Sequence, residues 1–458
     1  MNLKEIDICY FLGIGGIGMS ALARYFHKMG KTVMGYDRTS TPLTTELQVE
    51  GIDVHFKDSV VDLPAIIRQT PKERILVVYT PAIPSNHQEL TWFRAEGFAV
   101  QKRSAVLGWI TQDSPTIAVA GTHGKTTTTS IIAHLLHASG HGCNAFLGGI
   151  TANYSTNLLF ESPSAWTVVE ADEFDRSFLA LAPNIAVITS VDADHLDIYG
   201  THEEMLEGYK AFAEKVKEDG KLIIEESLPS SIEGVRYGFE DAAAIRSSSR
   251  YIHEGRPVFD IRFANGEQWE QLPLPMPGRH NHLNTIVAVA IAHELGISKD
   301  KTSDALASFR GIKRRFEYQE VGGDVVYIDD YAHHPSELTA AIDAAKEQHP
   351  GKRVTGVFQP HLFSRTKDHA DGFAEALSLL DEILLLDIYP AREEPIEGVD
   401  SQWLLDKIDH PHKKHVTKTH LLDELKQRHL EVLMTLGAGD IDQFVQPIAK
   451  MLSERETA

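Results

Sequence analysis

Short apolar runs alternate with amphipathic segments along most of the chain. Residues 8–14 (ICYFLGI) form the first apolar run, and residues 20–30 follow it with the spacing of a helix that buries one face. The same alternation recurs, with further apolar runs at 31–37, 74–80, 116–121, 166–173 and 184–194. Runs of this length between helices are typical of a parallel sheet covered on both faces. The pattern therefore predicts an α/β fold.

The pattern changes at three places, which suggest domain limits. It is interrupted over residues 104–115, where QDSP occurs. Between 220 and 277 the strands become short and turn-rich, which predicts an antiparallel insertion. A third α/β segment starts near Gly311. We expect a Rossmann-like domain over 1–104, a central P-loop ATPase-like domain over 105–311 and a second Rossmann-like domain over 312–458.

Length and composition agree with this division and exclude several classes of protein. A chain of 458 residues suggests about three domains. With 44 Lys and Arg against 65 Asp and Glu, the net charge of −21 argues against a nucleic-acid partner. No apolar run is long enough to span a membrane, and no signal peptide is evident, so we expect a cytoplasmic protein. Cys9 and Cys143 are expected to be buried free thiols.

A glycine turn follows the first strand. Gly13, Gly15 and Gly18 form a G-x-G-x-x-G pattern that opens a helix, and Asp37 ends the second strand. Such a turn lets backbone N–H groups approach a pyrophosphate, Gly18 is expected to allow close helix–strand packing, and Asp37 is placed to bind a ribose hydroxyl. A dinucleotide, any nucleotide diphosphate, or a turn without a ligand would all fit this pattern.

A second phosphate-binding loop follows the strand at 116–121. It is the short form Gly121-x-x-Gly124-Lys125-Thr126, because Val119 stands where a longer loop has its first glycine. Backbone N–H groups can hold phosphates, Lys125 can reach the β and γ oxygens, and the Thr126 hydroxyl can bind Mg²⁺. A dehydrogenase has no use for this loop, and a simple ATPase has no use for the first one.

Acidic residues end the next two strands. In a parallel sheet these ends share one crevice, so Glu170 is expected near Lys125 as the Mg²⁺ carboxylate. Glu173 and Asp175 are expected to be a solvated strand end. His195 ends the following strand, where it is a candidate for a second Mg²⁺.

Six motifs in fixed order resemble those of the Mur ligases of peptidoglycan synthesis: GTHGKTTTT, VVEADE, DADHLDIY, GRHNHLN, RRFE and DDYAHHPSE. The resemblance covers nearly the whole chain. It implies three domains, of which the first binds the UDP of a nucleotide-sugar, the second binds ATP and metal, and the third binds the incoming amino acid. The glycine turn then serves a UDP-sugar, through Gly13, Gly15, Gly16, Gly18 and Asp37.

The resemblance also assigns site residues. It implies a catalytic set of Lys125, Glu170, His195, Arg315 and Asp330, with Thr126, Glu170 and His195 on metal. It implies ATP contacts from Gly121, Thr122, Gly124, Lys125, Thr126, Thr127, His280, Asn281 and Asn284. Helix capping is the alternative for one of these asparagines, and a surface ion pair is the alternative for Arg315. His333, His334 and Arg365 are implied for the amino acid.

Two positions need separate mention. Many relatives carry an arginine where Leu362 stands in this chain. Related ligases use a carbamylated lysine near a second metal, and Lys210 lies roughly at that place.

The implied activity is that of an ATP- and Mg²⁺-dependent amide ligase that joins L-alanine to the carboxylate of UDP-N-acetylmuramate through an acyl phosphate. The segment FQPHLFSRT favours alanine addition. The alternative within the family is a recycling ligase that attaches a ready-made tripeptide to the same nucleotide-sugar. An NAD-dependent oxidoreductase would leave Lys125 unexplained, and a nucleotide-binding regulator would not need Glu170, His195 and Arg315 together. The oligomeric state stays open.

Overall fold

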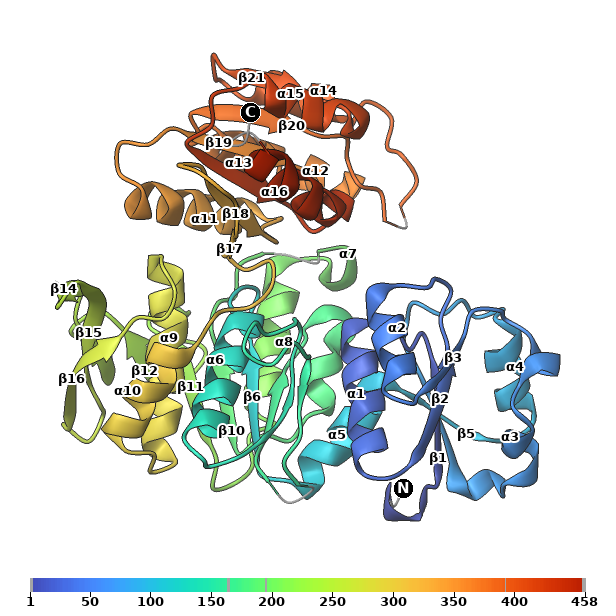
Figure 1. Ribbon diagram of the computed structural model, residues 1–458. Helices are drawn as coiled ribbons and strands as arrows, with labels where there is room; N and C mark the ends of the chain where they lie inside the picture. The colour runs from blue at the N-terminus through green and yellow to red at the C-terminus, as the bar shows by residue number, and fades with distance from the viewer. Residues whose placement is uncertain (1–2, 163–164, 194–195, 392, 455–458) are drawn as a thin grey trace. The chain divides into compact units, whose positions relative to one another are not determined.

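A computed structural model describes residues 3–162, 165–193, 196–391 and 393–454 (Figure 1). The chain forms two compact units. The first contains residues 1–274 and 283–309, and the second contains residues 275–282 and 310–458. The first unit holds two sheets and the second holds one, so the α/β class with three largely parallel sheets is confirmed. Within the described residues, no helix is long and apolar enough to cross a membrane.

The first sheet has five parallel strands in the order β3-β2-β1-β4-β5. Its elements are β1 (Ile8–Leu12), α1 (Ile17–Lys28), β2 (Thr32–Tyr36), α2 (Pro42–Val49), β3 (Asp53–His55), α3 (Ala65–Gln69), β4 (Ile75–Tyr79), α4 (Gln88–Ala95) and β5 (Ala99–Lys102). The strand order reverses between β1 and β4, where ligands bind in open parallel sheets. The glycine turn follows β1 at this point.

The second sheet has the order β14-β15-β13-β12-β11-β10-β6-β9-β7-β8, with β16 paired to β15. Its strands are β6 (Thr116–Ala120), β7 (Asn144–Phe146), β8 (Leu158–Leu159), β9 (Thr167–Glu170), β10 (Ile185–Ile188), β11 (Lys221–Glu225), β12 (Val235–Gly238), β13 (Ile245–Ser247), β14 (Tyr251–His253), β15 (Arg256–Arg262) and β16 (Gln268–Pro273). The helices of this part are α6 (Lys125–Ala138), α7 (Leu196–Tyr199), α8 (His202–Ala213), α9 (Arg279–Glu294) and α10 (Lys299–Ser308).

The prediction of an antiparallel insertion from residue 220 is wrong for its first half. β11, β12 and β13 continue the parallel sheet, with Ile223 paired to Val235 and Tyr237 to Ile245. Within the described strands of residues 220–277, antiparallel pairing is confined to the pairs that involve β14, β15 and β16. Short strands and turns in a sequence indicate a sheet, but they do not show whether its strands run parallel or antiparallel. That direction depends on the strand with which each one pairs.

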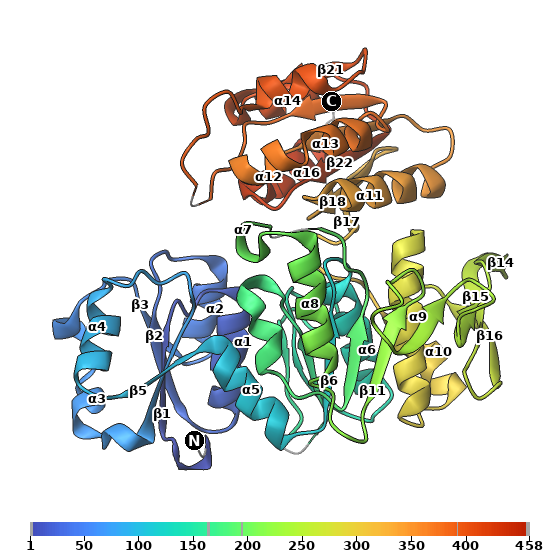
Figure 2. The same ribbon diagram turned by 180° about the vertical axis from the view of Figure 1, so that it is seen from behind.

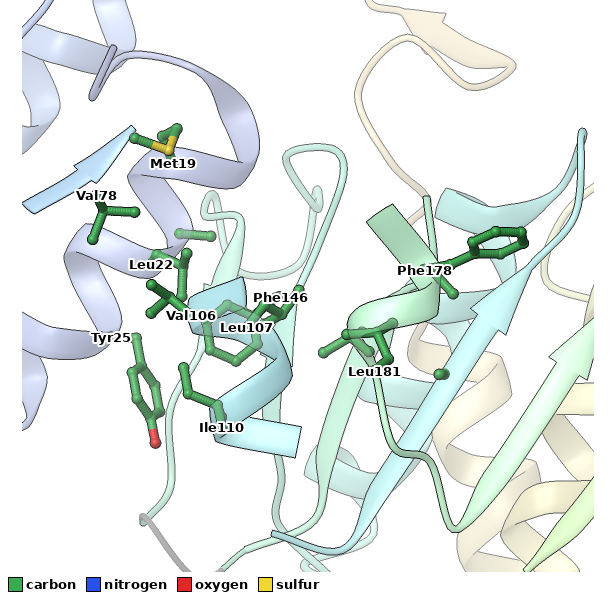
Figure 3. Packing of buried hydrophobic residues seen from close by; sticks show 14 of the residues in the cluster. Met19, Leu22, Tyr25, Val78, Val106, Leu107, Ile110, Phe146, Phe178 and Leu181 are labelled. Carbon is green, nitrogen blue, oxygen red and sulfur yellow. The ribbon is translucent and has the colours of Figure 1, made fainter. Parts of the chain in front are cut away.

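One hydrophobic core joins the two sheets of the first unit (Figure 3). Helix α5 (Arg103–Asp113) places Val106, Leu107 and Ile110 in this core, together with Leu22 of α1 and Phe146 of β7. The predicted interruption over 104–115 is therefore wrong for most of its length. These apolar positions have helical spacing, and the helix ends just before Pro115. The predicted boundary at residue 104 lies in the first turn of α5.

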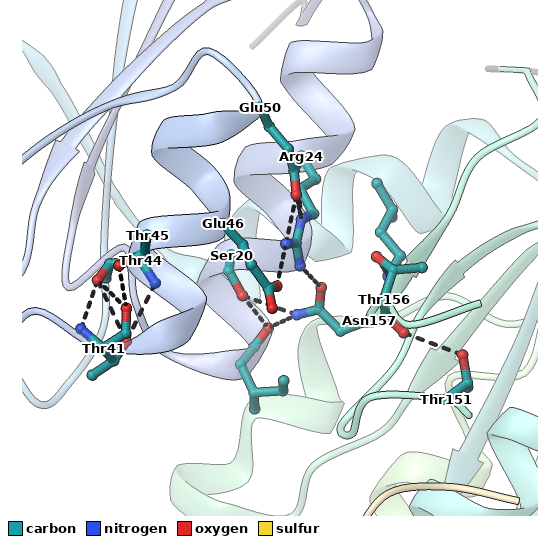
Figure 4. A network of polar contacts seen from close by, with 12 residues as sticks. Ser20, Arg24, Thr41, Thr44, Thr45, Glu46, Glu50, Thr151, Thr156 and Asn157 are labelled. Atoms are coloured by element: carbon teal, nitrogen blue, oxygen red, sulfur yellow. Dashed lines mark hydrogen bonds and ion pairs between the residues drawn. The ribbon is translucent and has the colours of Figure 1, made fainter. Parts of the chain in front are cut away.

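A buried polar network forms a second link between these sheets (Figure 4). The Arg24 guanidinium of α1 donates to Glu50 and Glu46 of the first sheet's helix layer and to the Asn157 side-chain oxygen beside β8. The Asn157 amide donates in turn to the Ile17 carbonyl, at 2.6 Å, and to Ser20 Oγ, at 2.9 Å. Residue 157 thus braces the first turn of α1, the helix that the glycine turn opens.

The second unit contains a six-stranded sheet in the order β17-β18-β22-β19-β20-β21, in which only β17 is antiparallel. Its strands are β17 (Glu317–Gln319), β18 (Val326–Asp330), β19 (Val354–Phe358), β20 (Glu382–Leu385), β21 (Lys413–His415) and β22 (Val432–Leu436). Its helices are α11 (Pro335–Gln348), α12 (Phe363–Asp368), α13 (Ala370–Leu377), α14 (Ser401–Lys407), α15 (Leu421–Lys426) and α16 (Val445–Glu454). All of them but α15 are labelled in Figure 2. Separate apolar clusters cover its two faces.

Both cysteines, Cys9 and Cys143, are buried free thiols, as predicted. Burial raises the pKa of each thiol to about 12. The thiols are therefore protonated and unreactive at neutral pH.

Candidate active site

The phosphate-binding loop connects β6 to α6, and its two glycines are required by the local geometry. Gly121 and Gly124 have φ angles of +136° and +81°. A Cβ atom at Gly121 would lie 2.1 Å from Thr189 Oγ1, and one at Gly124 would lie 2.6 Å from Asn284 Oδ1. Any side chain at either position would strain the backbone and collide with a neighbour, so the G-x-x-G spacing follows from the fold.

Lys125 begins helix α6, and its ammonium group is folded over the loop. Lys125 Nζ donates to the Gly121 carbonyl oxygen at 2.6 Å and to Glu173 Oε1 at 2.8 Å. Burial by itself would lower the pKa of Lys125, but the charges of Glu173, Asp172 and Glu170 outweigh it, so the pKa is raised. The lysine is a charged donor at neutral pH.

Glu173 corrects one sequence prediction. It is 1% exposed, whereas a solvated strand end was expected. Burial raises its pKa, and Lys125 opposes this shift. The motif contained no sign of this partnership, because residues 125 and 173 meet only through the packing of the two strand ends. Asp175 is partly exposed and lies 4.0 Å from Lys102 Nζ.

The loop is also tied to the segment that follows β10. The Thr122 hydroxyl donates to the Asp192 carbonyl oxygen at 2.8 Å, and the His123 N–H donates to Ser190 Oγ at 2.8 Å. His123 Nε2 lies 3.4 Å from Asp192 Oδ2. This segment leads toward His195, but residue 195 lies outside the described residues.

The position of Glu170 is set by its strand and by one backbone contact. It ends β9 in register with Val119 of β6, and its carboxylate accepts a hydrogen bond from the Gly148 N–H at 2.8 Å. A Cβ atom at Gly148 would lie 2.3 Å from this carboxylate, so residue 148 must be glycine for Glu170 to hold its position.

A magnesium ion would find oxygen ligands here. The Thr126 hydroxyl stands in the first turn of α6, and Glu170 supplies a carboxylate. No group of three or more His, Cys, Asp and Glu side chains within the described ranges is arranged to hold a metal. The Thr126 hydroxyl and the Glu170 carboxylate fit Mg²⁺, because this ion usually takes one or two carboxylates and completes its shell with water and substrate phosphates.

A cavity of about 300 Å³ connects the glycine turn with Glu170. Its walls include Gly16, Gly18, Arg103 and Asp172. Gly18 was expected to allow close helix–strand packing, but its neighbour is a side chain: a Cβ atom there would lie 2.5 Å from Arg103 Nη1. Arg103 is a site residue that the sequence interpretation missed. Its position directly after the strand β5 was the available signal.

Asp37 holds the glycine turn itself. Its Oδ2 accepts a hydrogen bond from the Gly15 N–H at 2.7 Å, and its Oδ1 accepts one from Thr39 N–H at 3.2 Å. Gly13 has a φ of +85°, and a Cβ atom there would lie 2.6 Å from Thr80. The carboxylate therefore shapes the turn, in addition to the ribose contact that the sequence predicts.

The two asparagines of α9 have different surroundings. Asn284 Oδ1 accepts a hydrogen bond from Thr128 Oγ1 of α6 at 3.1 Å, beside the phosphate-binding loop. Asn281 donates to the Pro277 carbonyl oxygen at 2.7 Å, which ties the start of α9 to the preceding loop. The ring of His280 borders Gly278, where a Cβ atom would lie 2.7 Å from it. Thr127 is buried in the first turn of α6.

In the second unit, Asp330 ends β18 and holds the RRFE turn. Its two oxygens accept hydrogen bonds from the N–H groups of Phe316 and Ala332, both at 2.7 Å. Burial raises the pKa of Asp330 to about 6, although Arg315 and these N–H groups oppose the shift. Arg315 lies over the Tyr331 ring, 5.2 Å from its centroid, and 3.9 Å from Glu337.

The neighbour of Asp330 has a structural role. Asp329 is fully buried and accepts hydrogen bonds from the Arg314 guanidinium at 3.1 Å and from Thr435 Oγ1 at 2.6 Å. Arg314 also donates to the Gly437 carbonyl oxygen at 2.7 Å. Arg314 and Asp329, the first arginine and the first aspartate of their motifs, thus join two strand ends.

His333, His361 and Arg365 form a cluster at the carboxyl ends of β18 and β19. The rings of His333 and His361 are 6.2 Å apart, and His361 stacks on Tyr389. Burial, with a smaller contribution from the charge of Arg365, lowers the pKa of both imidazoles to about 4, although Glu337 opposes the shift at His333 and Glu393 opposes it at His361. Both rings are neutral at pH 7. His361 was missed by the sequence interpretation, although it lies in FQPHLFSRT.

His334 differs from its neighbour. It is the N-cap of α11, where its Nδ1 contacts Ser336 Oγ at 2.8 Å. This geometry gives it a role in starting the helix. Leu362 has a φ of +71° and precedes α12. Lys210 donates to Glu207 at 2.7 Å on the surface of α8.

Three family models match successive parts of the chain. They are described as the Mur ligase family catalytic domain over 9–114, the Mur ligase middle domain over 119–292 and the Mur ligase glutamate ligase domain over 314–441. The UDP-N-acetylmuramate–L-alanine ligase of Flavobacterium johnsoniae is 50% identical over 454 residues, which cover 99% of this chain and 100% of that protein. The chain belongs to the Mur ligase family.

Solved structures of Mur ligases have the same fold. The UDP-N-acetylmuramate-alanine ligase of Thermotoga maritima matches with a TM-score of 0.80 and 27% identity, over 98% of this chain and 99% of that one. A murein peptide ligase of Psychrobacter arcticus matches with a TM-score of 0.70 and 22% identity over 98% and 99%. Both matches extend over nearly the whole of this chain and of the solved one.

Proposed function

We propose that this Mur ligase joins L-alanine to the carboxylate of UDP-N-acetylmuramate, with cleavage of ATP to ADP and phosphate, in peptidoglycan synthesis. The observation that carries the proposal is the full-length identity of about half to a relative of that name. The first unit supports it, because one cavity there leads from the glycine turn to Glu170, whose strand β9 pairs with the strand that precedes the phosphate-binding loop. The use of ATP and a nucleotide-sugar places the proposed reaction in the cytoplasm.

The first step activates the acid. A muramyl carboxylate oxygen attacks the γ-phosphorus of ATP, the bond to the β–γ bridging oxygen breaks, and an acyl phosphate and ADP result. Such a transfer depends on positioning and on neutralising charge. Lys125 is a charged donor at the start of α6, and the N–H groups of that helix face an anion. Mg²⁺ held by Thr126 and Glu170 would supply further positive charge.

The nucleotide-sugar is proposed to lie between the glycine turn and Glu170. Its diphosphate fits the N–H groups at the start of α1, which Asp37 and Asn157 hold in place. The cavity that Arg103 lines leads from there toward Glu170 and provides a path for the acid end. Arg103 is the cation on this path, and it is suited to a carboxylate or phosphate oxygen.

The second step forms the amide. The amine of L-alanine attacks the acyl carbonyl, and the tetrahedral intermediate loses phosphate while the nitrogen loses a proton. Arg365 is proposed to bind the carboxylate of L-alanine, since a guanidinium can do so with two hydrogen bonds. Its neighbours His333 and His361 are neutral at pH 7, so either imidazole can accept the proton of the amine. Arg315 and Asp330 are proposed to serve the nucleotide.

Phosphate release tests the proposal. The chain is incubated with ATP, Mg²⁺ and UDP-N-acetylmuramate, and L-alanine is compared with the tripeptide L-Ala-γ-D-Glu-diaminopimelate. Release that requires L-alanine supports the proposal. Release that requires the tripeptide would replace it with a recycling ligase, and absence of release with both would contradict ligase activity on this acid.

A further inference from the structure

A cavity of about 630 Å³ lies in the second unit at the end of the sheet opposite to the cluster of Arg365. Arg353, Asp381 and Glu431 line it, and each directly precedes a parallel strand, β19, β20 and β22 respectively. Asp330 and Arg365 come after the carboxyl ends of β18 and β19. The cavity therefore lies at the amino ends of the strands and does not belong to the catalytic edge of this sheet.

Two basic stretches that are far apart in the sequence form this cavity. Residues 346–353 (KEQHPGKR) contribute Lys346, Lys352 and Arg353, and residues 410–412 contribute two histidines. His349 adds a third imidazole. Three permanent cations thus stand against two carboxylates, in a chain whose net charge is −21. In such an acidic chain, three cations in one concavity form a local attraction for an anion.

The two carboxylates are fixed in the wall by the backbone. Asp381 Oδ2 accepts a hydrogen bond from Val354 N–H at 2.8 Å, and Glu431 Oε2 accepts one from Arg353 N–H at 2.8 Å. Asp381 Oδ1 also lies 3.6 Å from Lys346 Nζ. Each carboxylate has further lone pairs, which can accept hydrogen bonds from hydroxyl groups.

The cations make only long contacts with protein oxygens. Lys352 Nζ lies 3.4 Å from the Asp324 carbonyl oxygen, and Arg353 Nη2 lies 3.6 Å from Glu382 Oε2. An ammonium has three donors and a guanidinium five, so these contacts leave most of their capacity for a ligand. The wall thus offers several donors for an anion beside acceptors for hydroxyl groups.

We propose that this cavity binds a phosphate-bearing, hydroxylated small molecule, such as a sugar phosphate or a nucleotide. The phosphate contacts Lys346, Lys352 and Arg353, and the hydroxyl groups contact Asp381 and Glu431. The volume lies within the ~300–1,000 Å³ of small-molecule sites. A metal site is disfavoured, because the residues that the structure describes contain no suitable cluster of His, Cys, Asp and Glu. A nucleic acid would require a wider basic face.

Isothermal titration of the full chain with ribose 5-phosphate tests the proposal. The variant Lys352→Gln/Arg353→Gln removes two cations from the wall. The matched control Lys426→Gln/Lys450→Gln removes two exposed lysines of the same unit, whose side chains are 56% and 78% exposed. We expect binding at about 1 mM or tighter, a loss of about tenfold or more in the first variant, and a change below about twofold in the control.

Three further measurements define the site. Hydrogen exchange is expected to show protection at 346–354 and 410–416 when ribose 5-phosphate binds. Ribose and inorganic phosphate, each alone, are expected to bind more weakly than ribose 5-phosphate. Lys346→Gln is a second variant in case the double variant fails to fold, and its binding is expected to fall as well.

Two outcomes overturn the proposal. One outcome is equal affinity of Lys352→Gln/Arg353→Gln and its control for ribose 5-phosphate, or protection from hydrogen exchange confined to 121–128. Either result would assign the anion to the phosphate-binding loop of the first unit. Equal affinity for inorganic phosphate and ribose 5-phosphate would exclude the contacts that the carboxylates are proposed to make. Failure of this proposal would leave the ligase activity unaffected, because the phosphate-release assay is independent of ribose 5-phosphate.

Discussion

Lys125 Nζ lies 2.8 Å from Glu173 Oε1, so the lysine of the phosphate-binding loop has a buried partner of opposite charge. Glu173 is 1% exposed, and the lysine also donates to a carbonyl oxygen of its own loop. The pair holds a charged donor in place in the absence of nucleotide. Phosphate oxygens of a nucleotide must compete with Glu173 for this donor. We therefore expect the contact between Lys125 and Glu173 to change when a nucleotide binds.

Removal of Glu173 is expected to destabilise the protein, and ATP is expected to restore part of the loss. Glu173→Ala leaves Lys125 as a buried unpaired charge, which costs about 3 kcal/mol. Thermal unfolding with and without ATP and Mg²⁺ measures both effects. Glu214→Ala, at the exposed position directly after α8, is the control and should change stability by less than about 0.5 kcal/mol. Equal melting of the two variants would contradict the role of the pair.

Neutralising both members of the pair separates catalysis from folding. Lys125→Met/Glu173→Gln removes both charges, so neither partner is left buried and unpaired. We expect a folded protein that releases no phosphate but still binds UDP-N-acetylmuramate, since the glycine turn lies in the other sheet of the first unit. Calorimetry measures the binding, and phosphate release measures the activity. A folded variant that loses the nucleotide-sugar would show that this assignment of the two turns is wrong.

Gly148→Ala is expected to act through Glu170. The added Cβ would lie 2.3 Å from the Glu170 carboxylate, which must then move. We expect kcat to fall by about tenfold to a hundredfold and the Mg²⁺ concentration for half-maximal activity to rise, because a misplaced carboxylate is a poorer ligand. Glu170→Gln should give the same Mg²⁺ response. A Gly148→Ala enzyme with normal Mg²⁺ dependence would contradict the metal assignment.

Arg24 and Asn157 are expected to affect both stability and the affinity for the nucleotide-sugar. Asn157→Ala removes the acceptor of a buried guanidinium and frees the first turn of α1. We expect a loss of about 1–3 kcal/mol in the free energy of unfolding and a higher KM for UDP-N-acetylmuramate with little change in kcat. Lys57→Ala breaks an exposed ion pair in the same sheet and serves as the control. A change in kcat alone would argue against a bracing role.

His361 is expected to make stability depend on pH in the acidic range. Its pKa is about 4 in the folded chain, and its ordinary value is 6.5. As the pH falls from about 6.5 to about 4, the unfolded chain takes up a proton that the folded chain does not, so stability is lost. Relative to His361→Gln, the wild type should lose up to about 3 kcal/mol over this range.

Urea unfolding of both proteins from pH 7 to pH 4 measures this difference. His333 and Asp330 titrate in both proteins, so the comparison isolates the imidazole that faces Arg365, Glu393 and Tyr389. A difference in stability that does not vary with pH would show that His361 is not held neutral by its surroundings.

The local motifs were sufficient for the α/β class and for the positions of the two glycine loops, but they did not reveal helix α5. Gly121, Gly124 and Lys125 could be assigned to a phosphate-binding loop from sequence, because two glycines followed by Lys and Thr stand between a buried strand and a helix, whose first N–H groups can receive a phosphate. Glu170 could be placed because parallel strands end at one edge of the sheet, and its pairing with Val119 confirms this.

Contacts between distant segments needed the tertiary structure. The partnership of Lys125 with Glu173, the approach of Arg103 to Gly18 and the brace from Asn157 to α1 each join residues more than 40 positions apart. No local periodicity encodes such a contact. The same holds for the direction of β11 to β13, which depends on the strand beside each of them.

The amino-acid sequence was thus enough to predict the fold class, the two phosphate turns and the family, because each of these depends on residues that are neighbours in the sequence. Folding alone decided which charges are buried together and which imidazoles lose their protons. A pKa depends on burial and on the charges within a few ångströms, and both come from segments that the sequence separates.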